Sequence, residues 1–321
     1  MKALRAAHHK IALDASLDVP HLEPTSSHLL VRVLTCALNT GDAKFVSGAL
    51  RSAAESFMPG LEVCGVVEAM GAQAAAKGEF RYVVVETELA AVVPASVSAE
   101  QAVVLPLTGA VALQAIKDAG IKTGSRVLVL GATSDVGRMV VQLAKHAGAA
   151  FVAGRVPRKE LVASLPLDLV LVDDQKGTKW HDAFPVAADK FDVVVDCVGE
   201  PACWRHADKV LVRGGVFAVL LGELVTDGDV KATTELLTLG FVSMWKSFWP
   251  FAPKLKAVAQ FPTAAILRDL LALVEKQELA PALDASSPLA FTPEAVTQGL
   301  ARLSAHDQTG KLVVQIPQEA K

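Results

Sequence analysis

Residues 131–137 read Gly-Ala-Thr-Ser-Asp-Val-Gly and follow an apolar run that ends at Leu130. A buried strand that turns tightly into a helix is a typical pyrophosphate site, because free N–H groups and the helix dipole point at the anion. Glycines at both ends of the turn suit its tight bend and the packing of helix on strand. The turn is therefore predicted to bind a dinucleotide through Gly131, Ala132, Thr133, Ser134, Asp135, Val136 and Gly137.

Two residues of this turn depart from the usual glycines. The Cβ of Ser134 keeps the backbone further from a phosphate, although its hydroxyl can donate a hydrogen bond in return. A carboxylate at Asp135 repels a pyrophosphate unless it points to solvent. Taken alone, the pattern is equally compatible with an ordinary strand-to-helix turn.

The strand that follows ends in a basic segment. NAD-dependent enzymes place an acidic residue at this strand end, where it accepts a hydrogen bond from the ribose 2′-hydroxyl. This chain instead carries Gly154, Arg155, Arg158 and Lys159 there. Cations suit a 2′-phosphate, so the expected coenzyme is NADPH, with NADP preferred over NAD. The alternative is a solvated basic helix start, although cations at a helix N-terminus are mildly unfavourable.

The elements that must position these residues fall into two groups. Up to about residue 105 the patterns are those of strands, at 28–38, 62–70 and 80–93. From about residue 106, short apolar strands alternate with helices, which predicts a parallel sheet covered on both faces. The strands of that sheet are expected at 126–131, 149–154, 168–174, 190–199, 214–222 and 239–245. Helices are expected at 136–147, 158–165, 201–212 and 264–279, before a last strand at 310–316.

Composition excludes several classes of protein. The chain has 321 residues, of which 52% are hydrophobic and 20% are charged, so it can bury a large core. A net charge of −3 without a basic stripe argues against nucleic acid as a partner. The 4 cysteines are scattered, which fits a reducing compartment. We find no signal peptide and no apolar run of membrane-spanning length, so we expect a cytoplasmic protein with no membrane partner.

Five segments carry a family resemblance. They are LNTGDAKFVSGAL, PGLEVCGVVEAMG, LPLTGAVALQAI, FDVVVDCVG and TGKLVVQI. Together they resemble the zinc-independent medium-chain dehydrogenases/reductases of the quinone oxidoreductase (zeta-crystallin-like) group. The resemblance implies an α/β fold, in which a Rossmann doubly wound parallel sheet is joined to a GroES-like β-rich domain. The GroES-like domain would comprise 1–106 and 265–321, the Rossmann domain 107–264, and the active site would lie between them.

The resemblance also implies an activity without a metal. Zinc-dependent relatives hold their metal at positions that carry Asn39, Leu61 and Leu107 here, and leucine cannot coordinate a metal. Quinones and α,β-unsaturated carbonyls delocalise incoming charge onto oxygen, so they need less help than a simple carbonyl. We therefore expect an NADPH:quinone oxidoreductase-like enzyme that reduces quinones or α,β-unsaturated carbonyls by direct hydride transfer.

Further site residues follow from the matching motifs. Asn39 would contact the nicotinamide ribose or the substrate, Asp42 would fix the loop, and Lys44 could replace a missing proton donor. The remaining candidates for coenzyme binding are Thr108, Cys197, Val198, Leu220, Leu221 and Lys311. Asn39 could instead be an ordinary turn residue, and Lys311 could instead be a solvated lysine.

Several departures leave other functions open. The arginine and tyrosine of the family's Arg-Ser-Gly-x-Tyr motif are Val46 and Leu50, which weakens an assignment as an enoyl-thioester reductase. Together with Ser134 and Asp135, they also motivate an NADP(H)-binding scaffold or sensor with weak or no catalysis. We expect a homodimer joined edge to edge through the sixth strand. The aromatic cluster at 241–251 would line the substrate pocket, form the dimer contact or pack in the core.

Overall fold

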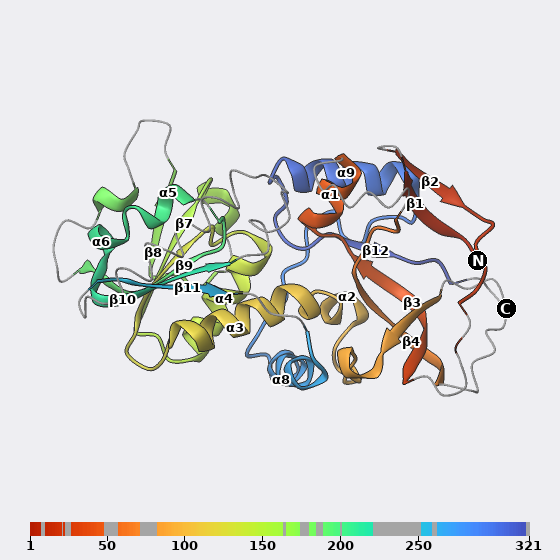
Figure 1. Ribbon diagram of the computed structural model, residues 1–321, viewed down its shortest axis with the longest axis horizontal. Coiled ribbons are helices and arrows are strands. Elements are labelled where there is room, and N and C mark those ends of the chain that lie inside the picture. The colour runs from red at the N-terminus through yellow and green to blue at the C-terminus, as the bar shows by residue number, and fades with distance from the viewer. Residues whose placement is uncertain are drawn as a thin grey trace. The chain divides into compact units, whose positions relative to one another are not determined.

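The computed structural model, shown in Figure 1, divides into two compact units. The first unit comprises Met1–Ala110 and Phe261–Lys321, and the second comprises Val111–Gln260. The structure describes residues 1–7, 10–20, 22, 27–47, 57–70, 82–162, 165–173, 180–183, 189–199, 201–220, 252–258 and 262–318.

The first unit is built around strand β3 (His28–Ala37). One edge of β3 pairs with β4 (Glu62–Met70), and the other pairs with β5 (Tyr82–Glu86) and then β12 (Val313–Gln315), all antiparallel. A separate hairpin joins β1 (Ala3–Ala7) to β2 (Lys10–Asp14). The arrows of β3, β4 and β12 lie side by side in Figure 1.

The register of this sheet brings distant parts of the chain together at the end of β3. Ala37, its last residue, pairs with Glu62 on one side and with Val313 on the other. The start of β4 and the start of β12 therefore flank the same residue. Polar side chains from both strands can meet there.

Helices and an apolar cluster complete the first unit. The helices in its described segments are α1 (Thr40–Ser47), α2 (Ala99–Ala102), α8 (Ala264–Glu275) and α9 (Pro293–Ser304), with short turns η2 (Thr87–Leu89) and η3 (Leu105–Gly109). Thr263 and Thr292 cap α8 and α9, because each side chain accepts a backbone N–H of the first turn. Leu300 and Leu303 of α9 pack with Val33, Leu38 and other apolar residues of the sheet.

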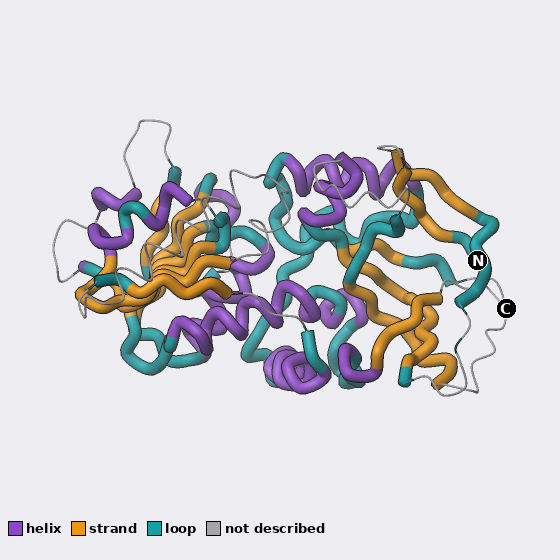
Figure 2. The backbone as a smooth tube through the Cα atoms, in the orientation of Figure 1, coloured by secondary structure: helices purple, strands orange, loops and turns teal. Residues whose placement is uncertain are grey.

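The second unit contains a six-stranded parallel sheet, with strand order β11-β10-β9-β6-β7-β8. Its strands are β6 (Arg126–Leu130), β7 (Phe151–Val156), β8 (Leu169–Val172), β9 (Phe191–Asp196), β10 (Leu211–Leu220) and β11 (Lys254–Val258). They lie side by side in Figure 2. The strand order reverses at β6, between β7 and β9, which is where ligands bind in sheets of this kind. Leu128, Leu130, Phe191 and Phe217 are almost fully buried in its core.

The helices of the second unit are shorter than predicted in two places. Those among the described residues are α3 (Ala110–Ala119), α4 (Asp135–His146), η4 (Lys159–Val162), η5 (Trp180–Ala183), α5 (Pro201–Trp204) and α6 (Ala207–Val210). The helix predicted at 158–165 is only the 3-10 turn η4 in its described part. The helix predicted at 201–212 is split into α5 and α6, and β10 already begins at Leu211.

The predicted α/β class is confirmed: a β-rich antiparallel unit accompanies a unit with a six-stranded parallel sheet. The sixth strand of the described sheet is β11 at Lys254–Val258. The strand predicted at 239–245 and the aromatic cluster at 241–251 lie outside the described residues. None of the described helices is both long enough and apolar enough to cross a membrane.

Candidate functional site

Asn39 lies at the junction between β3 and α1, and Asp42 holds it there. The Asp42 carboxylate accepts hydrogen bonds from the N–H of Asn39 at 2.8 Å and from the N–H of Gly60 at 3.0 Å. A side chain of the first helical turn that bonds the N–H preceding the helix forms half of a capping box. Burial raises the pKa of Asp42 and outweighs these N–H donors and the nearby charge of Lys311, which act to lower it. Asp42 therefore fixes the backbone of Asn39.

Lys311 and Glu62 form a buried ion pair at the end of β3. Their N···O distance is 2.8 Å, and their side chains are 1% and 0% exposed. The Lys311 ammonium also donates to Asn39 Oδ1 and, at 3.0 Å, to Thr108 Oγ1. These three acceptors match the three protons of an ammonium group. Lys311 is thus held by side chains from three separate segments of the chain.

Glu62 completes the same network. Its Oε2 accepts from Asn39 Nδ2 at 3.1 Å as well as from Lys311, and its Oε1 accepts from the backbone N–H of Leu107 at 2.7 Å. A buried carboxylate is tolerated when both of its oxygens are bonded in this way. We call Asn39, Glu62, Thr108 and Lys311 the Glu62–Lys311 network.

Thr108 is the member of this network with a proton to offer. It lies in η3 and is 3% exposed. Its hydroxyl oxygen accepts from Lys311, and its own hydrogen has no recorded acceptor among the described residues. Since a hydroxyl both accepts and donates, the contact with Lys311 leaves Thr108 able to donate to a ligand.

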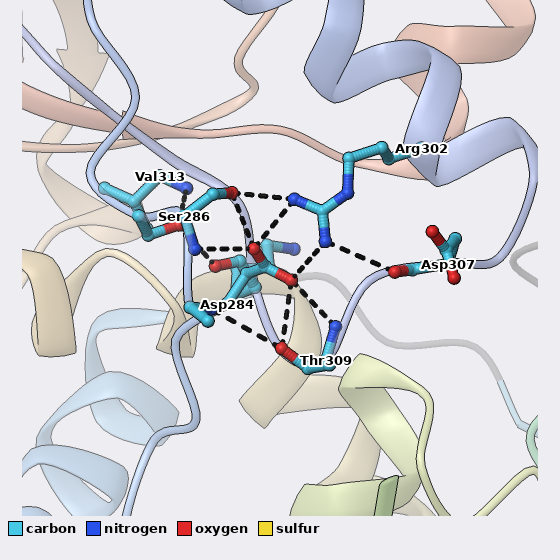
Figure 3. A network of polar contacts seen from close by, with 9 residues as sticks. Asp284, Ser286, Arg302, Asp307, Thr309 and Val313 are labelled. Atoms are coloured by element: carbon cyan, nitrogen blue, oxygen red, sulfur yellow. Dashed lines mark hydrogen bonds and ion pairs between the residues drawn. The ribbon is translucent and has the colours of Figure 1, made fainter. Parts of the chain in front are cut away.

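A second polar cluster surrounds Asp284, as Figure 3 shows. The buried carboxylate of Asp284 accepts two hydrogen bonds from Arg302, both at 2.9 Å, and further ones from Ser286 and Thr309. Burial acts to raise the pKa of Asp284, but these hydrogen bonds outweigh it and hold the pKa well below its ordinary value.

This cluster connects directly to the backbone of Lys311. The N–H of Asp284 donates to the carbonyl of Lys311 at 3.0 Å, and the N–H of Lys311 donates to the carbonyl of Ala282 at 2.8 Å. Asp284 and Arg302 therefore position Lys311 without contacting its side chain.

In the second unit, the turn after β6 requires its glycines. Gly131 has φ +73°, a conformation that side chains rarely adopt. A Cβ on Gly137 would lie 2.1 Å from the carbonyl oxygen of Gly131. Gly154 of β7 is equally constrained, because a Cβ there would lie 2.7 Å from the Cβ of Ala132. These glycines create the tight strand-to-helix turn that a pyrophosphate needs.

Much of the hydrogen bonding capacity of this turn is used internally. The N–H groups of Gly131 and Ala132 both donate to the carbonyl of Arg155, at 3.1 and 3.0 Å. Ser134 is the N-cap of α4 and accepts from the N–H of Gly137 at 3.0 Å. The Ser134 hydroxyl therefore retains a hydrogen to donate, and Val136 lies at the start of α4, where N–H groups have no partner within the helix.

Asp135 begins α4 and is close to the charge of Arg138. Burial lowers the pKa of Arg138, and the negative charge of Asp135 opposes that shift. Arg138 also donates to the carbonyl of Thr133 at 3.1 Å. Arg138, in the first turn of α4, thus offsets the charge of the Asp135 carboxylate, which was expected to repel a phosphate.

The basic residues after the turn divide into two groups. Arg158 and Lys159 are exposed, whereas Arg155 is partly buried and forms an ion pair with Asp173, its Nε lying 2.7 Å from Asp173 Oδ1. The end of β7 carries cations and no acid, as the sequence indicates, but Asp173, which follows the neighbouring strand β8, lies beside Arg155.

Hydrogen bonds fix the loop that follows β9. The buried Asp196 carboxylate accepts from the N–H groups of Val198 and Gly199, both at 3.0 Å, and the N–H of Cys197 donates to Leu130. Burial raises the pKa of the Cys197 thiol well above its usual value, so this cysteine stays a neutral thiol. Leu220 ends β10 and is buried, and Leu221 lies outside the described residues.

Lys44 is the residue predicted as a replacement proton donor. It is half-buried on α1. Asp42 lies two positions earlier on the same helix, and residues at this spacing do not face each other.

Comparisons with known proteins agree with both units. Residues 25–90 match the alcohol dehydrogenase GroES-like domain, and residues 167–314 match the zinc-binding dehydrogenase family. A 2-methylene-furan-3-one reductase of Solanum lycopersicum is 28% identical over 95% of this chain and 75% of its own length. The NADPH-dependent alkenal/one oxidoreductase of Arabidopsis thaliana is 27% identical with the same coverage. The chain belongs to the medium-chain dehydrogenase/reductase family.

Solved structures of this family share the fold. The quinone oxidoreductase of Coxiella burnetii superposes with a TM-score of 0.73 at 20% identity, over 99% of each chain. A cobalt- and zinc-bound thermostable alcohol dehydrogenase from Pyrobaculum aerophilum gives a TM-score of 0.76 at 22% identity, covering 98% of this chain and 99% of that one.

The positions that hold zinc in metal-dependent relatives do not fit a metal in this medium-chain dehydrogenase/reductase. Leu61 is 64% exposed and has no donor atom, and Leu107 contributes only a backbone N–H, which Glu62 accepts. The side chain of Asn39 is bonded to Glu62 and Lys311. No group of three or more metal-binding side chains is found among the described residues.

Sequence reasoning missed three site residues of this medium-chain dehydrogenase/reductase. Glu62 lies in the segment PGLEVCGVVEAMG, at a position where the family that this segment resembles carries an aspartate, and this was a signal that could have identified it. Asp173 and Asp284 gave no such signal, because each acts on a residue that is distant in the sequence.

Proposed function

We propose that this chain is an NADPH-dependent, zinc-independent reductase of quinones or α,β-unsaturated carbonyls that works by direct hydride transfer. Three relatives carry names of this kind: the furanone reductase, the alkenal/one oxidoreductase and a chloroplast envelope quinone oxidoreductase homologue of Arabidopsis thaliana, which is 27% identical over 93% of each chain. Their identity to this chain is low, so the substrate class rests on the chemistry of the site.

The second unit would hold the coenzyme. The turn from Gly131 to Gly137 fits a pyrophosphate, because its glycines leave a cradle that any Cβ would fill. Ser134 would donate its hydroxyl hydrogen to a phosphate. Arg158 and Lys159, both exposed, would meet the 2′-phosphate. Cys197, Val198 and Leu220 would line the carboxyl edge of the sheet.

The first unit would hold the reacting end of the coenzyme and the substrate. NADPH, when bound, supplies the hydride. Asn39, the half-buried member of the Glu62–Lys311 network, and Thr108 would contact the nicotinamide portion or the substrate oxygen, while Lys311, Glu62 and Asp42 position them. Lys44 remains a candidate proton donor, although solvent can protonate a released enolate or hydroquinone anion directly.

The single observation that carries this proposal is the Glu62–Lys311 network itself. It places the Thr108 hydroxyl, which can still donate a hydrogen bond, in a dry setting in the same network as Asn39, one of the positions where zinc-dependent relatives coordinate their metal. Hydrogen-bond donors stabilise charge that develops on a conjugated oxygen. They do not replace a Lewis acid that must produce an alkoxide from an alcohol. This favours electron-poor acceptors as substrates.

The test is a steady-state assay of NADPH oxidation with a quinone (9,10-phenanthrenequinone), an enal and a crotonyl thioester. Turnover with the quinone or the enal is expected, and Thr108→Val should lower kcat by about 10- to 100-fold with a small change in KM. Thr297→Val removes a hydroxyl from the exposed face of α9 and serves as the control. An unchanged kcat in Thr108→Val would refute the role of Thr108.

A second candidate function is coenzyme binding without catalysis. It is favoured by the turn after β6, where Ser134 caps α4 and Arg155 occupies two N–H groups. Calorimetric titration separates the two: NADPH binding without turnover on any acceptor would support the scaffold. Turnover confined to the thioester would support an enoyl-thioester reductase. We also propose a homodimer, which sedimentation would test.

A further inference from the structure

Arg155 lies directly against the turn that we assign to the coenzyme pyrophosphate. Its carbonyl oxygen accepts the N–H groups of Gly131 and Ala132. In sheets of this type the residue at this strand end faces the adenosine ribose. The side chain of Arg155 is therefore close to where a ribose 2′-substituent would lie.

The guanidinium of Arg155 is already engaged by the protein. Its Nε lies 2.7 Å from Asp173 Oδ1, its Nη1 lies 3.7 Å from Cys203 Sγ, and its Cζ is 6.0 Å from the centre of the Trp180 ring. Asp173 is fixed through its backbone, because its N–H donates to the carbonyl of Val156 at 2.9 Å. The Arg155 and Asp173 side chains are 18% and 41% exposed.

The two members of this pair favour different coenzymes. Arg155 attracts a 2′-phosphate, whereas the carboxylate of Asp173 repels it and also neutralises Arg155. The same carboxylate can accept a hydrogen bond from a 2′-hydroxyl, which is the role of the acid in NAD-dependent enzymes. Here the acid comes from the end of the next strand, β8, instead of from β7.

We propose that Asp173 is a specificity-determining residue that acts through Arg155 and reduces the preference of this chain for NADPH over NADH. The proposal rests on the proposed coenzyme function. Arg158 and Lys159 give the site its bias toward the phosphate, and Asp173 limits the size of that bias. Removal of the charge of Asp173 therefore increases the preference for NADPH over NADH.

The experiment is a calorimetric titration of the full chain with NADPH and, separately, with NADH. In Asp173→Asn the ratio of the NADH Kd to the NADPH Kd should rise by about 5- to 20-fold, as expected for one charge near a partly screened phosphate. Asp168→Asn is the matched control. Asp168 pairs with Lys145 and bonds Val152 at the opposite end of the same strands, and its side chain is 36% exposed.

A double-mutant cycle tests the route through Arg155. Arg155→Gln should lower the ratio, and adding Asp173→Asn to that variant should recover less than half of the gain seen in the wild-type background. An unchanged ratio in Asp173→Asn, or an equal change in Asp168→Asn, would overturn the inference while NADPH binding by the wild type still supported the proposed function. Failure of the wild type to bind either coenzyme would overturn both.

Discussion

Replacement of Lys311 by methionine tests whether the Glu62–Lys311 network is as tightly coupled as its geometry indicates. Methionine keeps most of the length of the side chain but removes the charge and three hydrogen bonds, and it leaves a carboxylate that is 0% exposed without its cation. Breaking a buried ion pair from one side costs about 3–5 kcal/mol. A unit of this size loses about 2–4 °C in Tm for each kcal/mol, so the Tm of the first unit should fall by roughly 6–20 °C.

Differential scanning calorimetry measures this change, because the two units can unfold in separate transitions. Lys276→Met, at an exposed position of the same unit, is the control and should shift the Tm by less than about 2 °C. In Glu62→Gln/Lys311→Met the loss should be smaller than the sum of the two single losses by about 2 kcal/mol. A Lys311→Met variant with the Tm of the wild type, or purely additive losses, would refute the coupling.

Two further predictions concern Asp284 in the first unit and Gly137 in the second. Because the pKa of Asp284 is lowered from 3.8 in the folded state, its stabilising contribution is present above that value and is lost as the pH falls toward the lower folded pKa. Asp284→Asn should therefore cost about 3 kcal/mol at pH 7 and progressively less below about pH 4, as measured by urea unfolding across pH; a difference independent of pH would contradict this. Gly137→Ala places a Cβ 2.1 Å from the Gly131 oxygen, so it should abolish NADPH binding in calorimetry and destabilise the second unit by about 2 kcal/mol or more. Gly41→Ala, whose Cβ would meet nothing within 4 Å, should leave both properties unchanged.

The parts of the fold that the sequence predicted are those set by local pattern. Short apolar strands such as 126–131 and 190–199 are buried on both faces, and the helix predicted at 136–147, which is observed at Asp135–His146, follows from its own periodicity. The predictions failed where local propensity was overruled. Residues 201–212 have a helical pattern, but parallel pairing of Leu211 with Phe191 draws the end of that segment into the sheet.

The site was predictable in its members but less so in their contacts. Asn39, Thr108 and Lys311 were identified from motifs, and the structure brings all three together. Their common partner Glu62 was missed, because its role follows from the antiparallel register that pairs it with Ala37. Asp173 was missed for a similar reason: it follows β8, and the parallel pairing of β7 with β8 places the carboxyl ends of both strands at the same edge.

The chain order of the first unit has a consequence for its biogenesis. A ribosome releases Glu62 and Thr108 well before Lys311, and the whole second unit is synthesised in the interval. Until β12 pairs with β3, the nascent chain contains the Glu62 carboxylate, which is buried in the folded protein, without the Lys311 ammonium that neutralises it. The Glu62–Lys311 network is therefore completed last, after the second unit has had time to fold.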